Sequence, residues 1–136
     1  MPRLNTTLTV ALTLFVLTPP ATAQQSEQPE KYLLLATNRT GTMEEELNEA
    51  GARGYRFAGA QGGETAFGGR EAVVIMTLDP EGRRFRYMLL ATNRTGTMQE
   101  EMNAAPTEYD FAGMTVFSST FGGREAAVIL EAEITD

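Results

Sequence analysis

The strongest constraint on the fold is an internal duplication. The segments 32–50 and 87–105 are identical at 15 of 19 positions, at an offset of 55 residues. The match resumes at an offset of 54, where the nine residues from Phe67 and the nine from Phe121 differ at one position. Two copies are too few for a solenoid. The repeat therefore predicts a single duplicated domain over residues 31–136, with repeat one at 31–80 and repeat two at 84–134.

The apolar pattern predicts three strands in each copy. In copy one, residues 31–37 form a short Leu-rich run, and residues 55–60 alternate between two faces. Residues 72–78 are almost continuously apolar and β-branched, which is typical of a central strand. A turn at 79–82, with Pro and Gly in suitable places, then leads into the first strand of copy two at 85–92.

A helix is expected between the first and second strands of each copy. Thr42 is followed three residues later by Glu45, which predicts a capping box at the helix start, and the acidic residues beside it would complement the helix dipole. Gly51 and Gly54 are expected to end this helix. In copy two, Thr97 and Glu100 repeat the start of the helix, and this second helix is expected to end at Pro106.

The element order is therefore βαββ-βαββ, an α+β fold with about six strands and two helices packed on the sheet. One copy of about 45 to 50 residues buries too little surface to be stable by itself. We therefore expect the copies to form one pseudo-twofold unit. The pattern leaves open whether the strands form one continuous sheet or two sheets.

The segment from Leu47 to Phe57, LNEAGARGYRF, precedes a Gly-rich connection and an apolar strand. It resembles a short bacterial domain family of unknown function, whose members carry a helix ending in LN-x-x-G-x-x-G-aromatic. The resemblance extends over both copies and implies a βαββ unit without an established activity. Copy two departs from the motif, because Pro106, Thr107 and Glu108 replace the glycine-bearing turn.

The first 23 residues have the pattern of a secretory signal peptide. A basic start is followed by ten apolar residues at 8–17 and by Ala21-Thr22-Ala23, a small-x-small cleavage site. The signal would direct the protein to the periplasm or the medium, and cleavage would follow Ala23. Residues 24–30 are polar and aperiodic, which indicates a flexible leader. No membrane association is expected after cleavage.

The composition excludes several kinds of chemistry. The chain has no Cys and no His, so it has no disulfide, no usual zinc site and no Ser-His-Asp or Cys-His nucleophile. Its net charge of -7 argues against a nucleic-acid partner. We therefore expect no enzyme activity, no catalytic residues, no cofactor and no metal.

Two strand-to-helix loops are the main candidate binding site. They consist of Asn38, Arg39, Thr40, Gly41 and Thr42 in copy one, and of Asn93, Arg94, Thr95, Gly96 and Thr97 in copy two. A helix N-terminus with an adjacent Arg can hold an anion. Copy two should repel an anion less, because Gln99 replaces Glu44. The alternative interpretation is turn and cap chemistry alone.

Arg70 and Arg124 are secondary candidates, since each follows a Gly-Gly pair in the second duplicated element. With Phe67 and Phe121 near a pseudo-twofold axis, these two Arg residues could grip an acidic or planar partner. The alternative is a Gly-Gly turn followed by solvated residues of an edge strand. The leading function is an exported, non-catalytic binding or interaction module, with a protein partner or a small anion. The alternative is a periplasmic or extracellular protein that binds a small anionic ligand through the duplicated loops.

Overall fold

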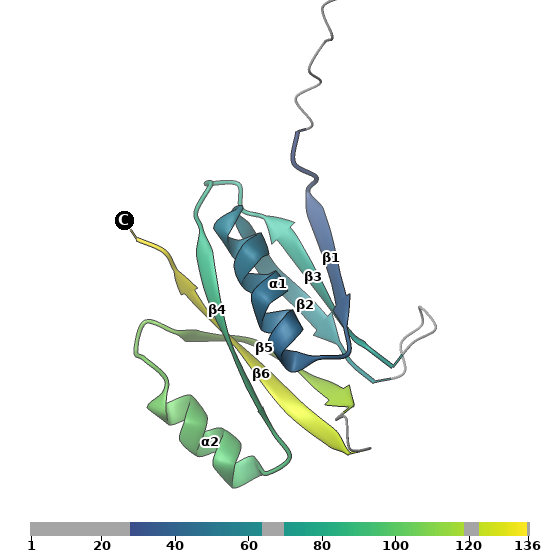
Figure 1. The fold of residues 1–136 in the computed structure, drawn as a ribbon. Helices are drawn as coiled ribbons and strands as arrows, with labels where there is room; N and C mark the ends of the chain where they lie inside the picture. The colour runs from purple at the N-terminus through teal and green to yellow at the C-terminus, as the bar shows by residue number, and fades with distance from the viewer. Residues whose placement is uncertain (1–27, 64–69, 119–122, 136) are drawn as a thin grey trace, which may run out of the picture.

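The computed structural model describes residues 28–63, 70–118 and 123–135 (Figure 1). The expected signal peptide, most of the leader and the Gly-Gly pairs before Arg70 and Arg124 lie wholly or partly outside these residues.

The α+β class is confirmed, with six strands and two helices in the described part of the chain. The elements are β1 (Tyr32–Thr37), α1 (Thr40–Ala52), β2 (Tyr55–Gln61), β3 (Ala72–Leu78), β4 (Phe85–Thr92), α2 (Thr95–Ala104), β5 (Asp110–Ser118) and β6 (Arg124–Glu133). The strands predicted at 72–78 and 85–92 have the bounds expected from the sequence.

The strands form two separate three-stranded sheets, which answers the question that the sequence left open. The first sheet has the order β1-β3-β2 and the second β4-β6-β5, and every pairing is antiparallel. In each sheet the last strand of the copy lies in the middle, between the two strands that the helix connects (Figure 1). The two halves therefore share one strand order.

β2 departs from the simple alternation expected of residues 55–60. Its register with β3 shifts between Phe57 and Gly59, so that Phe57 lies opposite Met76 and Gly59 opposite Ile75. The extra residue in a bulge reverses which side chains face inward. Ala60, rather than Gly59, therefore lies on the core side with Phe57. β5 has the same irregularity, between Phe111 and Gly113.

The helix starts differ from the predicted capping boxes. The N-cap residues are Arg39 and Arg94, and neither helix has a side-chain cap hydrogen bond. α1 begins at Thr40, so Thr42 already lies inside the first turn, where its hydroxyl is not placed to cap, and this turn holds no acidic residue. The loop is fixed instead by Thr37, whose Oγ1 accepts a hydrogen bond from the Arg39 N–H (3.3 Å).

The helix ends agree better with the sequence. Gly54 has a φ of +89° and donates its N–H to the Gly51 carbonyl, which confirms it as the glycine after α1. Gly51 lies within the helix instead of ending it. α2 ends at Ala104, two residues before Pro106, as expected.

The turn between the two copies is held by Asp79. Its Oδ2 accepts hydrogen bonds from the N–H groups of Glu81 (3.1 Å) and Arg83 (3.0 Å), and its Oδ1 accepts one from Arg83 Nη2 (2.8 Å). The Arg83 side chain, helped by these N–H groups, lowers the pKa of Asp79 to about 2. Gly82 takes the positive φ (70°) that completes the turn.

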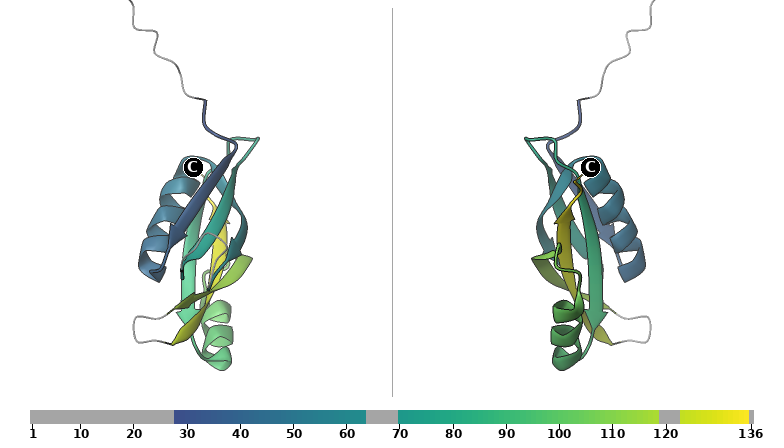
Figure 2. Two further views of the ribbon diagram at one scale, coloured as in Figure 1. Left: turned by 90° about the vertical axis from the view of Figure 1, so that its right-hand side faces the viewer. Right: turned by 90° about the vertical axis from the view of Figure 1, so that its left-hand side faces the viewer.

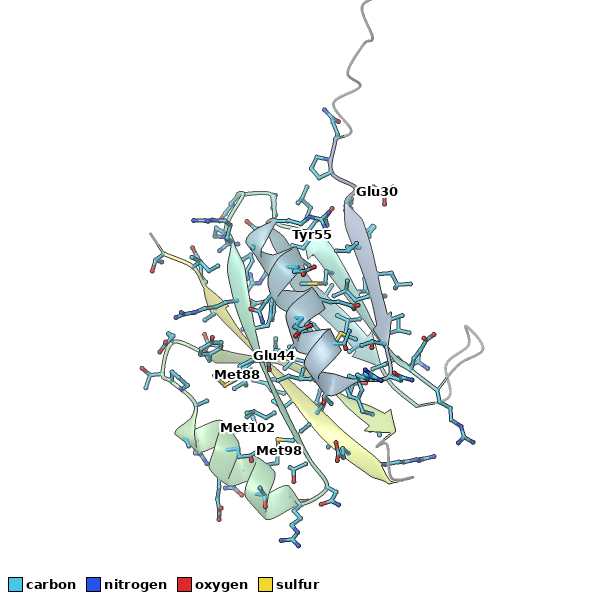
Figure 3. The ribbon with its side chains drawn as sticks, viewed as in Figure 1. Glu30, Glu44, Tyr55, Met88, Met98 and Met102 are labelled. Carbon is cyan, nitrogen blue, oxygen red and sulfur yellow. The ribbon has the colours of Figure 1, made fainter. Side chains whose placement is uncertain are left out.

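The main core lies between the two sheets and beneath α1. α1 covers one face of the first sheet, and the second sheet packs against that same side, with β4 next to α1 (Figures 1 and 2). The core combines Met43, Leu47, Val74 and Met76 of copy one with Phe85, Tyr87, Phe117 and Ile129 of copy two. A smaller cluster lies between α2 and the second sheet, where Met88, Met98 and Met102 meet (Figure 3).

The described residues do not show the expected twofold equivalence. Tyr87 is 3% exposed, whereas its repeat counterpart Tyr32 is 58% exposed. Residues related by a twofold axis would have the same surroundings. The second sheet uses the face opposite α2 to contact copy one, while the corresponding face of the first sheet exposes Tyr32, Leu34 and Ile75.

Candidate functional site

α1 closes the open edge of β4 with two polar side chains. Asn48 Nδ2 donates to the Tyr87 carbonyl (3.0 Å), and Asn48 Oδ1 accepts from the Tyr87 N–H (2.9 Å). Glu44 Oε2 accepts from the Leu89 N–H (2.8 Å). β4 is an edge strand of its sheet. The helix side chains therefore supply the hydrogen bonds that a neighbouring strand would otherwise make.

A buried polar network joins the two sheets behind this edge. The Tyr87 hydroxyl donates to Glu131 Oε2 (3.0 Å) and accepts from the Phe57 N–H (2.9 Å). Arg56 Nε donates to the other Glu131 oxygen (2.8 Å). Burial raises the pKa of the Tyr87 hydroxyl, and the Glu131 carboxylate raises it further. The hydroxyl therefore stays protonated and holds the two sheets together.

A groove lies beside α2, which covers only part of its face of the second sheet. We call it the α2 groove. Its volume is about 660 Å³, and its lining is mostly apolar. It is lined by Thr92, Asn93, Arg94, Thr95, Met98, Gln99, Met102, Asn103, Met114, Val116, Arg124, Glu125 and Ala126. Met98 and Met102 project from α2 toward the sheet at this groove (Figure 3).

The structure brings together part of the candidate site. Asn93, Arg94 and Thr95 of the copy-two loop line the α2 groove, and so does the secondary candidate Arg124. Gly96 and Thr97 follow in the first turn of α2 and are not part of the lining.

The copy-one candidates lie elsewhere. Over the described residues, the groove lining includes none of Asn38, Arg39, Thr40, Gly41 and Thr42, and it does not include Arg70. Arg39 is exposed at the start of α1, and Arg70 is exposed just before β3. The two loops, identical in sequence, therefore stand in different surroundings, and of the two it is the copy-two loop that lines the α2 groove.

The apolar residues of the groove were not foreseen. Met102, Met114 and Val116 occupy the positions of Leu47, Ala60 and Gly62 in copy one. Copy two carries larger or more flexible apolar side chains at these positions. A position-by-position comparison of the two copies is the signal that could have identified them, because identical neighbours make such differences stand out.

A second hollow, also of about 660 Å³, is mainly polar and is lined by residues of β2, β4, β5 and β6. Its carboxylates are largely engaged, because Glu131 pairs with Arg56 and Glu108 pairs with Arg86. Among the residues that the structure describes, no three acidic, His or Cys side chains are grouped so as to hold a metal ion. Neither helix in the described ranges is long and apolar enough to cross a membrane.

Comparisons with protein-family models, with curated proteins and with solved structures give no significant match to this chain. The resemblance to a short bacterial βαββ family therefore stays a prediction. Any functional conclusion rests on the geometry of the chain itself.

Proposed function

We propose that this protein is a non-catalytic binding module and that the α2 groove is its binding surface. The observation that carries the proposal is the open apolar groove beside α2. Met114 and Val116 remain exposed there, because α2 does not extend over this part of the sheet face on which it packs. A concave apolar surface with a few polar groups at its rim is typical of a site that buries part of a partner.

The packing of α2 supports this proposal. α1 buries four residues, Met43, Leu47, Ala50 and Gly51, whereas α2 buries Met98 alone. A helix held by so little apolar surface gains stability when a partner fills the space beside it. We propose an apolar protein segment as the main class of partner.

A small anionic ligand with an apolar part is the second candidate. Arg94 and Arg124 border the same groove, whose lining has one acidic residue, Glu125, so the two Arg charges outnumber it. Such a ligand would place its carboxylate or sulfonate near the Arg side chains and its apolar part against Met98 and Met102.

The location of the protein is part of the proposal. We propose that the pattern in residues 1–23 directs export, so that the domain meets its partner in the periplasm or the medium. Mass spectrometry of protein recovered from outside the cytoplasm checks this, with Gln24 expected as the first residue. Retention of residues 1–23 in that material contradicts it.

Titration with 8-anilinonaphthalene-1-sulfonate, an apolar anionic dye, tests the groove. We expect saturable binding that weakens at least about tenfold in Met114→Glu, because the new charge would be buried by the dye. Ala52→Glu, which adds the same charge at the exposed end of α1, is the matched control. Equal affinity in both variants, or no saturable binding, contradicts the proposal.

The same titration separates the two candidates. If the groove recognises an anion, Arg94→Ala weakens dye binding, while Arg39→Ala, its counterpart in copy one, does not. An effect of Met114→Glu without any effect of Arg94→Ala supports an apolar protein segment over an anion.

A further inference from the structure

The contact between the two halves of the chain serves as a template for a contact between chains. In this internal contact, α1 and the first sheet hold the face of the second sheet that points away from α2. The Asn48 side chain donates to the Tyr87 carbonyl and accepts from the Tyr87 N–H, and the Glu44 carboxylate accepts from the Leu89 N–H. Each partner in this contact has a repeat counterpart that lacks the corresponding bond.

On the groove side, the counterparts of Asn48 and Glu44 are Asn103 and Gln99. Both are exposed and both line the α2 groove. Asn103 Nδ2 donates to the Gln99 carbonyl one turn earlier (2.8 Å), just as Asn48 Nδ2 donates to the Glu44 carbonyl (2.8 Å). The amide of Asn103 is therefore held in the arrangement that Asn48 uses to bond β4.

On the strand side, the counterparts of Tyr87 and Leu89 are Tyr32 and Leu34 of the edge strand β1. The Leu78 N–H donates to the Lys31 carbonyl (2.8 Å). Because hydrogen-bonded pairs alternate along an antiparallel ladder, the main-chain groups of Tyr32 and Leu34 point away from β3. They are therefore directed outward, as those of Tyr87 and Leu89 are directed toward α1.

A second internal contact has the same kind of counterpart. The Phe57 ring packs on Gly113, where an added Cβ would lie 2.6 Å from the ring. The repeat counterparts are Phe111, which is 57% exposed, and Gly59, where an added Cβ would meet nothing within 4 Å. An exposed ring and an open glycine are thus present at the positions that the template requires.

The exposed face of the first sheet has the apolar chemistry that the second sheet already buries. Leu34 lies opposite Ile75 in the ladder, and both are exposed. Of their counterparts, Ile129 is buried in the main core and Leu89 is partly buried against it. The free face of the first sheet therefore matches a surface that this chain is able to bury.

We propose that the α2 groove of one molecule binds the exposed face and β1 edge of the first sheet of a second copy. This inference rests on the proposed function of the groove and names its partner. The two contacting surfaces are different, so the contact is heterologous. An open assembly therefore always has one unoccupied groove at one end and one unoccupied sheet face at the other. The assembly therefore grows head to tail, until it closes into a ring or continues as a filament.

Two substitutions make this contact weaker than its template. Gly62 passes so close to the Val116 carbonyl that a Cβ there would overlap it, and the counterpart of Gly62 is Val116. A Cβ at Gly51 would likewise overlap the Phe85 carbonyl, and the counterpart of Gly51 is Pro106. The contact between molecules must be wider at these ends, so association should depend on protein concentration.

The polar network is replaced without a conflict of charge. The counterparts of Arg56 and Glu131 are Asp110 and Thr77. An ion pair in the template thus becomes a carboxylate facing a hydroxyl that can donate to it. No pair of like charges is created at this place in the interface.

Sedimentation velocity of the full chain over a range of concentrations tests the proposal. We expect a rise in mean mass with concentration, and at least a tenfold loss of association in Leu34→Glu, which places a charge on the free sheet face. Ala52→Glu is the matched control and should associate as the unchanged protein does. A single monomeric species at all concentrations overturns the proposal.

Crosslinking defines which surfaces meet, and the chain has no Cys that would interfere. One sample carries Asn103→Cys and the other Tyr32→Cys, and the two are mixed with a short bismaleimide. We expect the mixed pair as the main product. Products that join Tyr32→Cys to itself indicate a symmetric contact and overturn the head-to-tail arrangement. If the protein stays monomeric but still binds the dye in its groove, this inference alone is refuted. If the protein neither associates nor binds the dye, the proposed function is refuted as well.

Discussion

Asn48 shows how much depends on the surroundings of one side chain. It bonds its own helix and both main-chain groups of Tyr87, and so joins α1 to the edge of the second sheet. Asn103, the same residue in copy two, keeps the bond to its own helix, and its amide stands at the α2 groove. The amino acid is the same, and the neighbouring strand makes the difference.

Tyr87 and Tyr32 allow a matched test at this scale. We expect Tyr87→Phe to lower the free energy of unfolding by about 1–3 kcal/mol, because it removes the hydroxyl between the Phe57 N–H and Glu131 and leaves both buried groups with one bond fewer. Tyr32→Phe removes an exposed hydroxyl and should change stability by less than about 0.5 kcal/mol. Urea unfolding at low protein concentration measures both. Equal effects in the two variants would show that the network contributes nothing to stability.

At the scale of elements, the two helices differ more than their sequences suggest. α1 has 13 residues and packs on β4, β1 and β2, whereas α2 has 10 residues and packs mainly on β4. Gly51 permits the close approach of α1 to β4, since it lies against the Phe85 carbonyl. In copy two Pro106 stands at this position, and α2 ends at Ala104.

Glycine substitutions in α1 test this close approach. We expect Gly51→Ala to destabilise the fold by about 1–3 kcal/mol, because the new methyl group would overlap the Phe85 carbonyl and lie 2.8 Å from the Tyr87 ring. Gly41→Ala, in the first turn of the same helix, meets nothing within 4 Å and should stabilise by about 0.5 kcal/mol. Thermal unfolding distinguishes the two. A neutral Gly51→Ala would mean that α1 can move away from β4 at no cost.

The turn that joins the copies should respond to acid. The pKa of Asp79 is lowered from 3.8 to about 2 in the folded chain, chiefly by the Arg83 hydrogen bond. A carboxyl group whose pKa is lowered by folding stabilises the native state above its unfolded pKa, and this contribution is lost as the pH falls from about 4 to about 2. The stability difference between the unchanged protein and Asp79→Asn should therefore be constant near neutral pH and shrink over that interval.

Urea unfolding at a series of pH values measures that difference. Glu81→Gln is the control, because the Glu81 side chain is 69% exposed and contributes little. A difference between the unchanged protein and Asp79→Asn that persists unchanged at pH 2 would contradict the assignment to the Asp79 carboxylate.

At the scale of the whole molecule, neither half has a complete core. Met43 and Leu47 of copy one lie in one cluster with Tyr87 and Ile129 of copy two, and α1 provides the hydrogen bonds at the β4 edge. The two sheets are therefore expected to fold together, as the small size of each copy also suggests.

Separating the copies tests this dependence. We expect residues 24–80 alone to show no cooperative thermal transition, whereas residues 24–136 unfold in one step, because the first copy by itself exposes the face that Tyr87 and Ile129 cover. Circular dichroism during heating measures both. A sharp transition in the shorter chain would show two independent domains.

Local patterns predicted the elements well and their junctions less well. β-branched and apolar runs identified β3 and β4 with correct bounds, and Gly54 and Pro106 were correctly placed at helix ends. The helix starts were wrong, because the chain turns into the helix at Thr40 and passes Thr42 as part of the first turn. The bulge after Phe57 was missed, because Ala58, Gly59 and Ala60 are all small and hide the shift that the extra residue makes in the alternation of side chains.

The binding role of the candidate residues stays a prediction. The structure places Arg94 and Arg124 at one groove, together with Asn93 and Thr95 of the copy-two loop. The apolar walls formed by Met98, Met102 and Met114 were not predicted, because these residues come together only when α2 packs on the second sheet.

By itself the sequence determined the βαββ order of each copy, since propensity, turn residues and apolar runs act over a few neighbouring residues and are repeated in both copies. Only the tertiary structure decided which of two identical residues is buried. Leu89 is partly buried against the main core and Leu34 is exposed, although both belong to the same LLAT segment. The reason is geometric. The face of the second sheet that points away from α2 packs against the side of the first sheet that α1 covers, and is buried there. The corresponding face of the first sheet, which points away from α1, faces solvent.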